Sequence, residues 1–384
     1  MRVGQMVREL VGSCSSVVHS VRAAAVMALV EGIVQGGRLS PATIGRALSG
    51  GALPKHSIKR VDRLLGNPKM VGDRVFFFKA IALRLLRQCA RPVVLVDWTQ
   101  AGQHVALVAA VPIGGRALPI YVEVHRLKKL GNAAVEKRFL CTLKTIIPTE
   151  CRSVIVSDAG FKGPFFQAVL DQGWDFLGRI RGTTKAVSSV GETISKEQFY
   201  ARALVTPTDL GSFGLFVRQQ IPCRLVLIRK RRRPGPKRLP PACKEEREMR
   251  QAALDPWLLA TSLFDDDAAS IVRLYARRMQ IEETFHDTKN HRFGWSFGDV
   301  RLSTPQRTAV LLTLAALAFL VVTLVGMAAE RRDDHRAYQA NTAKRRVLSF
   351  AALTAAILLR NALDRYSIDD LLTSLASIPK KVSV

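Results

Sequence analysis

Residues 92–124 read PVVLVDWTQAGQHVALVAAVPIGGRALPIYVEV, and this stretch decides the fold. Apolar and β-branched residues fill positions 93–96, 104–113 and 118–124, a pattern typical of buried strands. The turn sequence PIGGR separates the second run from the third. The stretch therefore predicts three consecutive strands, the first of which ends at Asp97.

Helices and further strands alternate after this stretch. The pattern predicts a helix over 132–147 closed by Pro148, a strand over 154–156, a helix over 163–172 and a strand over 176–180. The order β-β-β-α-β-α-β is that of the ribonuclease H fold, in which helical crossovers reach the later strands. We therefore expect an α/β protein with a ribonuclease H-like catalytic core, a mixed five-stranded sheet flanked by helices.

The sequence pattern of residues 1–90, which precede the core, predicts only helices. Over residues 1–90, apolar residues recur at spacings of three and four. Two segments, 40–48 and 55–65, resemble a helix pair joined by a turn, and Ser40 followed by proline suits an N-cap. The second helix is either a recognition helix on DNA or an ordinary solvated face, and we favour DNA contact. The basic residues on that helix are Lys55, Lys59 and Arg63.

The net charge indicates a polyanionic partner. The 384 residues include 58 Lys or Arg against 31 Asp or Glu, a formal charge of +27. Such a surplus repels itself in a compact protein, so nucleic acid or an anionic membrane is the expected partner. The six cysteines lack the spacing of a zinc site or a disulfide framework. With no secretory signal pattern at the N-terminus, a cytoplasmic location is expected.

Residues 182–261 predict a β-rich, basic insertion within the core. Residues 91–181 and 262–330 would be the two parts of that core, and 331–384 a helical C-terminal region. Prolines downstream of the basic run at 229–233 exclude regular structure there. A solvated loop is the ordinary interpretation of such a run, and a loop beside a phosphate backbone is the functional one. The run consists of Arg229, Lys230, Arg231, Arg232 and Arg233.

One apolar stretch allows a different interpretation. Residues 308–329 carry no charge and are long enough to cross a membrane. A helix buried on all sides within a large protein has the same composition. We favour the buried helix and no membrane partner, since a single membrane span leaves the acidic residues described next unexplained.

Two aspartates at predicted strand ends are candidate metal ligands. Asp97 follows the run VVLV, and Asp158 follows VIVS. In a ribonuclease H sheet these strands are neighbours, and two adjacent carboxylates repel each other unless a cation offsets their charge. Mg²⁺ prefers such oxygen ligands and retains several waters. The chemistry then needs a third acid.

A predicted helix over residues 275–289 supplies the third acid. At about 100° per residue, one narrow stripe of this helix collects a phenol, two cations and one carboxylate. A solvated helix with i,i+4 pairs does not need that set, whereas a DNA end with bound metal does. The nearby acids Glu283 and Asp287 point away from the stripe. The stripe consists of Tyr275, Arg278, Glu282 and Lys289.

These four residues have the spacing Tyr-x2-Arg-x3-Glu-x6-Lys, which resembles the YREK motif of DDE transposases of bacterial insertion sequences, specifically the Tn-five type of the IS-four family. Asp97 and Asp158 stand where the first two acids of that family would be. The sequences LSPATIGR at 39–46, KHSIKRVDRLLGN at 55–67 and PWLLAT at 256–261 are similar as well. The resemblance covers most of the chain.

The resemblance implies cut-and-paste transposition of an insertion sequence, by end nicking, hairpin formation and resolution, and strand transfer into target DNA. Asp97, Asp158 and Glu282 would hold two Mg²⁺ ions, for which Mn²⁺ would substitute. The same resemblance implies that Trp257 stacks on a flipped base, although on sequence alone Trp257 is more typical of a core residue.

The implied partners are the terminal inverted repeats, target DNA and a second copy of the chain, paired through the C-terminal helices. The implied location is the nucleoid of a bacterial cytoplasm. Two alternatives remain open at this point. One is a structure-selective nuclease on the same fold, and the other is a membrane-associated DNA-binding protein without enzyme activity.

Overall fold

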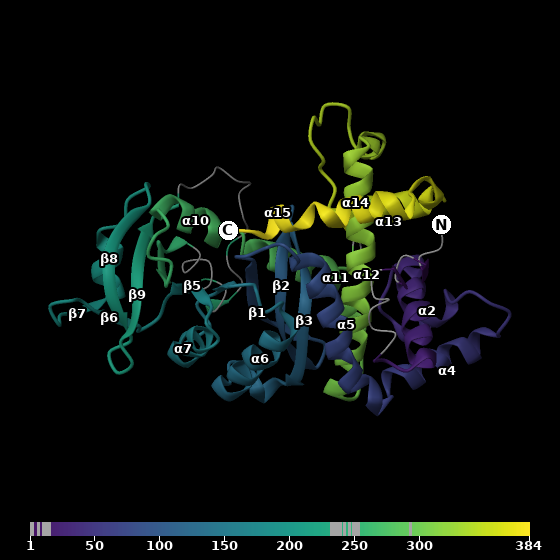
Figure 1. Ribbon diagram of the computed structural model, residues 1–384, viewed down its shortest axis with the longest axis horizontal. Helices are drawn as coiled ribbons and strands as arrows, with labels where there is room; N and C mark the ends of the chain where they lie inside the picture. Colours follow the sequence, from purple (N-terminus) through teal and green to yellow (C-terminus); the bar gives the residue numbers. More distant parts are fainter. Residues whose placement is uncertain are drawn as a thin grey trace. The chain divides into compact units, whose positions relative to one another are not determined.

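The computed structural model of the protein describes residues 4–5, 8–9, 17–230, 240, 243–244, 247, 254–291 and 294–384. The chain divides into two compact units, both made of strands and helices (Figure 1). The first unit consists of Met1–Ser153 and Met279–Val384, and the second unit is Val154–Arg278. This mixed α/β composition agrees with the predicted fold class.

The strands of the first unit form an antiparallel meander, as predicted: β1 (Val93–Ala101), β2 (His104–Ile113) and β3 (Arg116–Arg126). The predicted end of the first strand at Asp97 is wrong, because β1 continues to Ala101 and Asp97 pairs with Val108 inside the ladder. Acidic residues are depleted in strands, so the sequence pattern places the strand end too early.

Helices make up most of the remaining first unit. They are α2 (Ser20–Gly36), α3 (Pro41–Arg46), α4 (Pro54–Leu65), α5 (Pro68–Leu86), α6 (Ala133–Ile146), α11 (Met279–Lys289), α12 (Pro305–Arg331), α13 (Phe350–Leu359), α14 (Ile368–Ala376) and α15 (Ile378–Val382), with short 3₁₀ helices η2 (Leu127–Lys129), η3 (Phe297–Asp299), η4 (Asp334–Tyr338) and η5 (Leu363–Arg365). Ser40 is the N-cap of α3, as predicted, since its side chain accepts a hydrogen bond from the Thr43 backbone at 3.4 Å.

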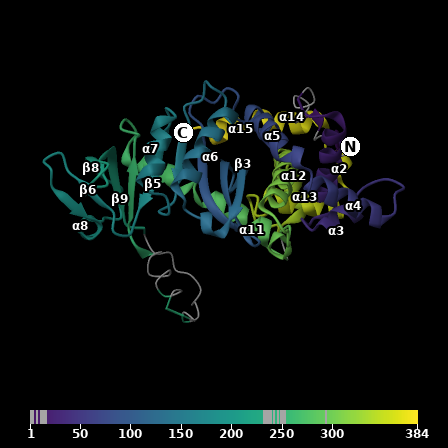
Figure 2. The same ribbon diagram turned by 90° about the horizontal axis from the view of Figure 1, so that it is seen from below.

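Helices cover both faces of the meander (Figure 2). Over one face, Phe78 of α5 and Phe139 of α6 both pack on Tyr121 of β3. On the other face, α11 contacts all three strands and α12 contacts β3. The meander is therefore the central layer of the first unit.

The apolar stretch at 308–329 forms most of α12, a helix of 27 residues. Almost all of this stretch is buried against α2, α5, α13, α14 and β3. Among the described helices, α12 alone is long and apolar enough to cross a membrane. Its burial accounts for its composition without a membrane, as the buried-helix interpretation expected.

The second unit consists of β4 (Val154–Ser157), α7 (Gly163–Asp171), β5 (Asp175–Ile180), β6 (Lys185–Val187), β7 (Thr193–Ser195), α8 (Lys196–Ala201), β8 (Thr208–Leu215), β9 (Ile221–Ile228), β10 (Trp257–Thr261) and α10 (Ala268–Ala276). Its strands are ordered β4-β5-β10-β9-β8-β6-β7. β4 and β5 are parallel, and each later neighbour is antiparallel. From β1 to β5 the elements therefore follow the predicted order β-β-β-α-β-α-β along the chain.

The close packing of α12 on α13 can be tested at Gly326. A Cβ added at Gly326 would lie 2.6 Å from the backbone oxygen of Phe350, so Gly326→Ala forces the helices apart. We expect it to lower the free energy of unfolding by about 1–3 kcal/mol, measured by denaturant titration. Gly72 of α5 is the matched control, because a Cβ there meets nothing within 4 Å. Equal losses in the two variants would contradict this packing.

A second test concerns acid stability. Burial, with a smaller effect of Arg126, lowers the pKa of His104, whose Nδ1 lies 3.1 Å from the Thr308 hydroxyl. Between that lowered pKa and about 6.5 the unfolded chain binds more protons, so stability falls as the pH falls. The free energy of unfolding should therefore drop less from pH 7 to pH 5 in His104→Gln than in the wild type. An identical drop would contradict a neutral, buried His104.

Candidate active site

The helix predicted over residues 275–289 is broken, so the single stripe expected from the sequence is wrong. α10 ends at Ala276, and α11 begins at Met279. The backbone N–H groups of Arg277 and Arg278 bond to carbonyls three residues back, at 3.1 and 3.0 Å. This tighter bonding is common where an α-helix ends, and the apolar and polar pattern does not reveal it.

The break divides the four predicted residues into two pairs. Tyr275 and Arg278 belong to the second unit, whereas Glu282 and Lys289 belong to α11 in the first. Within α11, Glu282 and Lys289 still lie about 20° apart around the helix axis.

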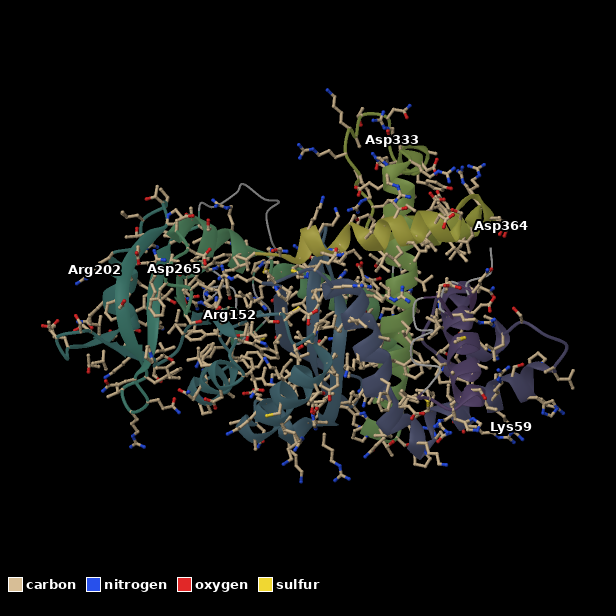
Figure 3. The ribbon with its side chains drawn as sticks, in the orientation of Figure 1. Lys59, Arg152, Arg202, Asp265, Asp333 and Asp364 are labelled. Atoms are coloured by element: carbon tan, nitrogen blue, oxygen red, sulfur yellow. The ribbon has the colours of Figure 1, made fainter. Side chains whose placement is uncertain are left out.

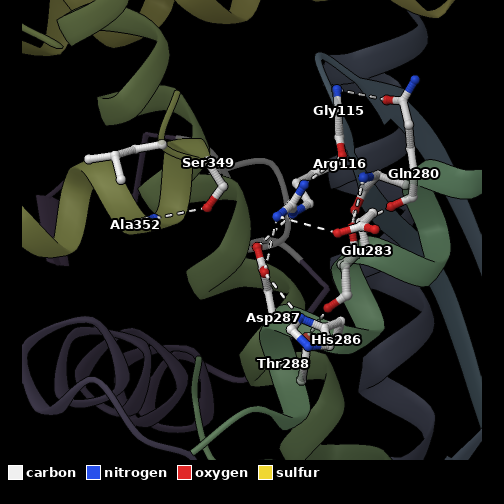
Figure 4. A network of polar contacts seen from close by, with 12 residues as sticks. Gly115, Arg116, Gln280, Glu283, His286, Asp287, Thr288, Ser349 and Ala352 are labelled. Carbon is white, nitrogen blue, oxygen red and sulfur yellow. Dashed lines mark hydrogen bonds and ion pairs between the residues drawn. The ribbon is translucent and has the colours of Figure 1, made fainter. Parts of the chain in front are cut away.

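Polar contacts fix the rotation of α11 on β3 (Figure 4). The Thr284 hydroxyl accepts a hydrogen bond from the Ala117 backbone at 2.8 Å and donates to its carbonyl at 3.0 Å. Arg116 donates to both carboxylate oxygens of Asp287, at 2.7 and 3.2 Å, and lies 3.7 Å from Glu283. Glu283 and Asp287 are therefore bound to β3, and of the three acids Glu282 alone lies on the helix face of Lys289.

Asp97 and Thr99 face α11. The Trp98 indole between them points the opposite way and donates to Glu136 of α6 at 2.9 Å. Because successive side chains of a strand alternate, the residues on either side of Trp98 face α11. The Lys289 ammonium confirms this orientation by donating to the Thr99 hydroxyl at 2.7 Å.

The environment of Lys289 is poorly hydrated. A cavity of about 50 Å³ beside it is lined by Phe285, Trp295 and Phe319. Burial lowers the pKa of Lys289, while the nearby Asp97 carboxylate opposes that shift. Asp97 is itself only 9% exposed, so an acid and a cation are held together at a site of restricted solvent access.

In the second unit, Tyr275 is the centre of a buried cluster. Its ring packs edge-to-face on Trp257, with centroids 4.8 Å apart. Burial raises the pKa of Tyr275 to about 12, against the opposing effect of Arg278 and Arg179 and with a small addition from Asp158. Because of this raised pKa, the Tyr275 phenol stays protonated at neutral pH. Asp158 follows β4 directly, as predicted.

Trp257 begins β10 and is 6% exposed. The Lys230 ammonium lies over its ring, 3.4 Å from the centroid. Both the core-residue interpretation and the base-stacking interpretation of Trp257 are compatible with this burial, but a base could stack on that face only if Lys230 moved away.

Arg179 and Arg181 are residues that the sequence interpretation missed. Burial lowers the pKa of Arg179, and the adjacent Arg181 lowers it further. Arg179 donates to the backbone carbonyls of Asp255 and Pro256, at 3.0 and 3.2 Å. With Arg278 these residues gather three guanidinium groups near Tyr275, an arrangement that an anion would stabilise. The sequence signal that could have identified Arg179 is its position inside β5, a strand of mostly apolar residues.

The structure describes some of the other residues predicted to contact DNA. Lys55, Lys59 and Arg63 are exposed along α4, where Figure 3 labels Lys59. Arg229 donates to the backbone carbonyls of Tyr200 and Ala203, at 3.2 and 3.4 Å. The remaining residues of the basic run, Arg231, Arg232 and Arg233, lie outside the described residues.

The donor chemistry suits Mg²⁺, which binds carboxylate oxygens. Asp97 and Glu282 come from elements in contact in the first unit, and Asp158 comes from the second. Within either unit, the described residues contain no group of three His, Cys, Asp or Glu side chains able to hold a metal.

Comparison with families of known proteins gives a match. A family model described as the transposase DDE domain matches residues 109–321, just over half of the chain. No curated protein matches significantly. Asp158, Trp257, Tyr275, Arg278, Glu282 and Lys289 lie inside the matched range, and Asp97 lies before it.

The clustered guanidinium groups predict that anions stabilise the protein. Inorganic phosphate at constant ionic strength should raise the free energy of unfolding, by about 1 kcal/mol when phosphate is at roughly five times its Kd. Arg179→Met should reduce this gain. Arg202→Met is the matched control, since Arg202 is exposed in the same unit. Equal gains in both variants would show that phosphate does not bind at the cluster.

Proposed function

The chain belongs to the family of proteins with a transposase DDE domain, and from this premise we propose that it moves an insertion sequence by a cut-and-paste mechanism. As a DDE transposase it acts on DNA. The steps that we propose are nicking of the element's end, hairpin formation, hairpin opening and strand transfer into target DNA.

The rotation of α11 carries this proposal. Arg116 holds Glu283 and Asp287 against β3. Glu282 lies on the same helix face as Lys289, because the two are seven residues apart. The Lys289 ammonium in turn binds Thr99 on the strand of Asp97. We propose Asp97, Asp158 and Glu282 as the catalytic acids, with two Mg²⁺ ions, replaceable by Mn²⁺, as cofactors. When bound, the ions would activate water or a DNA 3′-hydroxyl and stabilise the leaving oxygen.

The cations and the phenol would hold the DNA end. Tyr275, Arg278 and Lys289 are proposed to bind the 5′-phosphate of the strand that is not transferred, with Arg179 and Arg181 enlarging the guanidinium cluster. A phenol that stays protonated at neutral pH can donate to a phosphate oxygen. Trp257 would stack on a base flipped out near the cut end, displacing Lys230 from its ring.

We assign the protein to the Tn-five type of the IS-four family, on the YREK spacing from Tyr275 to Lys289. The break at Arg277–Arg278 leaves this spacing along the chain unchanged. A homodimer paired through the C-terminal helices and nucleoid association in the cytoplasm are part of the same proposal. A structure-selective nuclease, the alternative enzyme, would cleave DNA but would not join a pre-cut end to target DNA.

The acid assignment predicts a sharp contrast between neighbouring residues. Asp97→Ala, Asp158→Ala and Glu282→Ala should each slow Mg²⁺-dependent end cleavage by roughly 10²–10³-fold or more while preserving end binding. Glu283→Ala is the matched control, because Glu283 is half-exposed and paired with Arg116. Cleavage and binding are measured on labelled duplex. Near wild-type cleavage by any of the first three variants would refute the role of that residue.

The base-stacking role of Trp257 predicts a step-specific defect. Trp257→Ala should spare the first nick but slow hairpin formation by an amount consistent with losing about 1–3 kcal/mol of stacking. Trp257→Phe, which keeps an aromatic face, should retain most of the rate. Gel analysis over time separates nicked, hairpin and double-strand-break products. Equal loss of every product would instead support the core-residue interpretation.

A further inference from the structure

The turn that follows β3 exposes two leucines, one on either side of a pair of lysines. η2 and the residue after it carry the sequence Leu127-Lys128-Lys129-Leu130. Leu127 is 55% exposed and Leu130 is 58% exposed. Neither lysine forms an ion pair with any part of the chain that the structure describes. An isolated exposed leucine needs no explanation, whereas two exposed leucines on one turn with two lysines between them form a distinctive surface.

Backbone contacts hold this turn in place. The Leu130 N–H donates to the Leu127 carbonyl at 3.0 Å, and the Asn132 N–H donates to the Lys129 carbonyl at 3.1 Å. The Asn132 side chain also caps α6 by accepting from the Val135 N–H at 3.1 Å. The two leucines are therefore presented by a turn that is anchored to a strand on one side and a helix on the other.

The register of the meander places this turn within a short distance of Asp97. Arg126, the last residue of β3, pairs with His104, which also pairs with Ala101 at the end of β1. Asp97 is four residues back along β1. With about 3.3 Å per residue and about 4.8 Å between strands, Asp97 and Arg126 are roughly 16 Å apart, the length of about five base pairs of duplex.

We infer that Leu127 and Leu130 form a wedge that inserts into a base step of duplex DNA about five base pairs from the cleaved phosphate. Apolar side chains inserted in this way unstack and bend the duplex, while Lys128 and Lys129 bind the flanking phosphates. Charge complementarity favours DNA as the occupant, because two lysines lie between the exposed leucines on a chain of net charge +27. The inference rests on the proposed function and adds a DNA-deforming contact to it.

The test compares a perfect duplex with an otherwise identical duplex that carries one unpaired adenine. The bulge has already lost stacking, so the wild type should bind it roughly tenfold more tightly. The double variant Leu127→Ser/Leu130→Ser should bind both duplexes with equal affinity, close to that of the wild type for the perfect duplex. Leu127→Met/Leu130→Met should retain the preference, because the methionines keep an apolar wedge.

Two further variants separate the wedge from charge and from general surface effects. Lys128→Ala/Lys129→Ala should weaken binding to both duplexes equally and reduce the salt dependence by about two phosphate contacts. Val190→Ser is the matched control, since Val190 is 78% exposed between β6 and β7, and it should bind like the wild type. Thermal melts confirm that all variants are folded.

The outcomes distinguish this inference from the proposed function. If the wild type binds and cleaves DNA without preferring the bulge, or if the serine variant keeps the preference, the wedge is refuted and the proposed function stands. If the serine variant weakens binding to both duplexes equally, the leucines contact DNA without insertion, and the wedge is again refuted. A wild type that binds neither duplex would refute the proposed function and the wedge with it.

Discussion

The docking of α11 on β3 is the constraint on which the proposed site depends. Two consecutive turns of this helix carry acids at positions 282, 283 and 287, and only the rotation of the helix decides which acid faces β1. Thr284 fixes that rotation through its two bonds to Ala117, and Arg116 reinforces it through its paired bonds to Asp287. A rotation of about 100°, one residue around the helix, would exchange Glu282 for a neighbour.

Each unit also holds cations of the candidate set where burial disfavours their charge. Lys289 and Arg179 both have lowered pKa values because of burial, and Arg181 and Arg278 lie with Arg179 around the Tyr275 phenol. In a free protein such clustering costs stability, since each desolvated cation repels the next. A bound phosphate backbone would reverse that cost. The proposed DNA contact would therefore stabilise the guanidinium cluster of the second unit.

Much of the fold could be predicted from the sequence, because its signals are local. The meander follows from three apolar runs, and the N-cap at Ser40 follows from the chemistry of that position. The uniform apolarity of residues 308–329 predicts a long apolar helix, but only the packing around α12 shows that this helix is buried within the protein. The extension of β1 beyond Asp97 could not be predicted, since it depends on pairing with β2. The break after α10 was missed for a similar reason: a change from four-residue to three-residue hydrogen bonding leaves the apolar pattern intact.

The candidate residues, too, divide into some that the sequence suggested and others that it missed. Glu282 was selected by projecting a continuous helix, and that projection survives only within α11, where Arg116 supplies an independent reason for the choice. Arg179 and Arg181 lacked a spacing motif, so only their position near Tyr275 in the folded protein identifies them. The central claim is that Glu282, rather than Glu283, joins Asp97 at the metal. Anomalous diffraction from crystals of the protein with Mn²⁺ and a DNA end tests it most directly. We expect a manganese peak about 2.0–2.3 Å from carboxylate oxygens of both Asp97 and Glu282; a peak on Glu283 or Asp287 would show that the assignment of Glu282 is wrong.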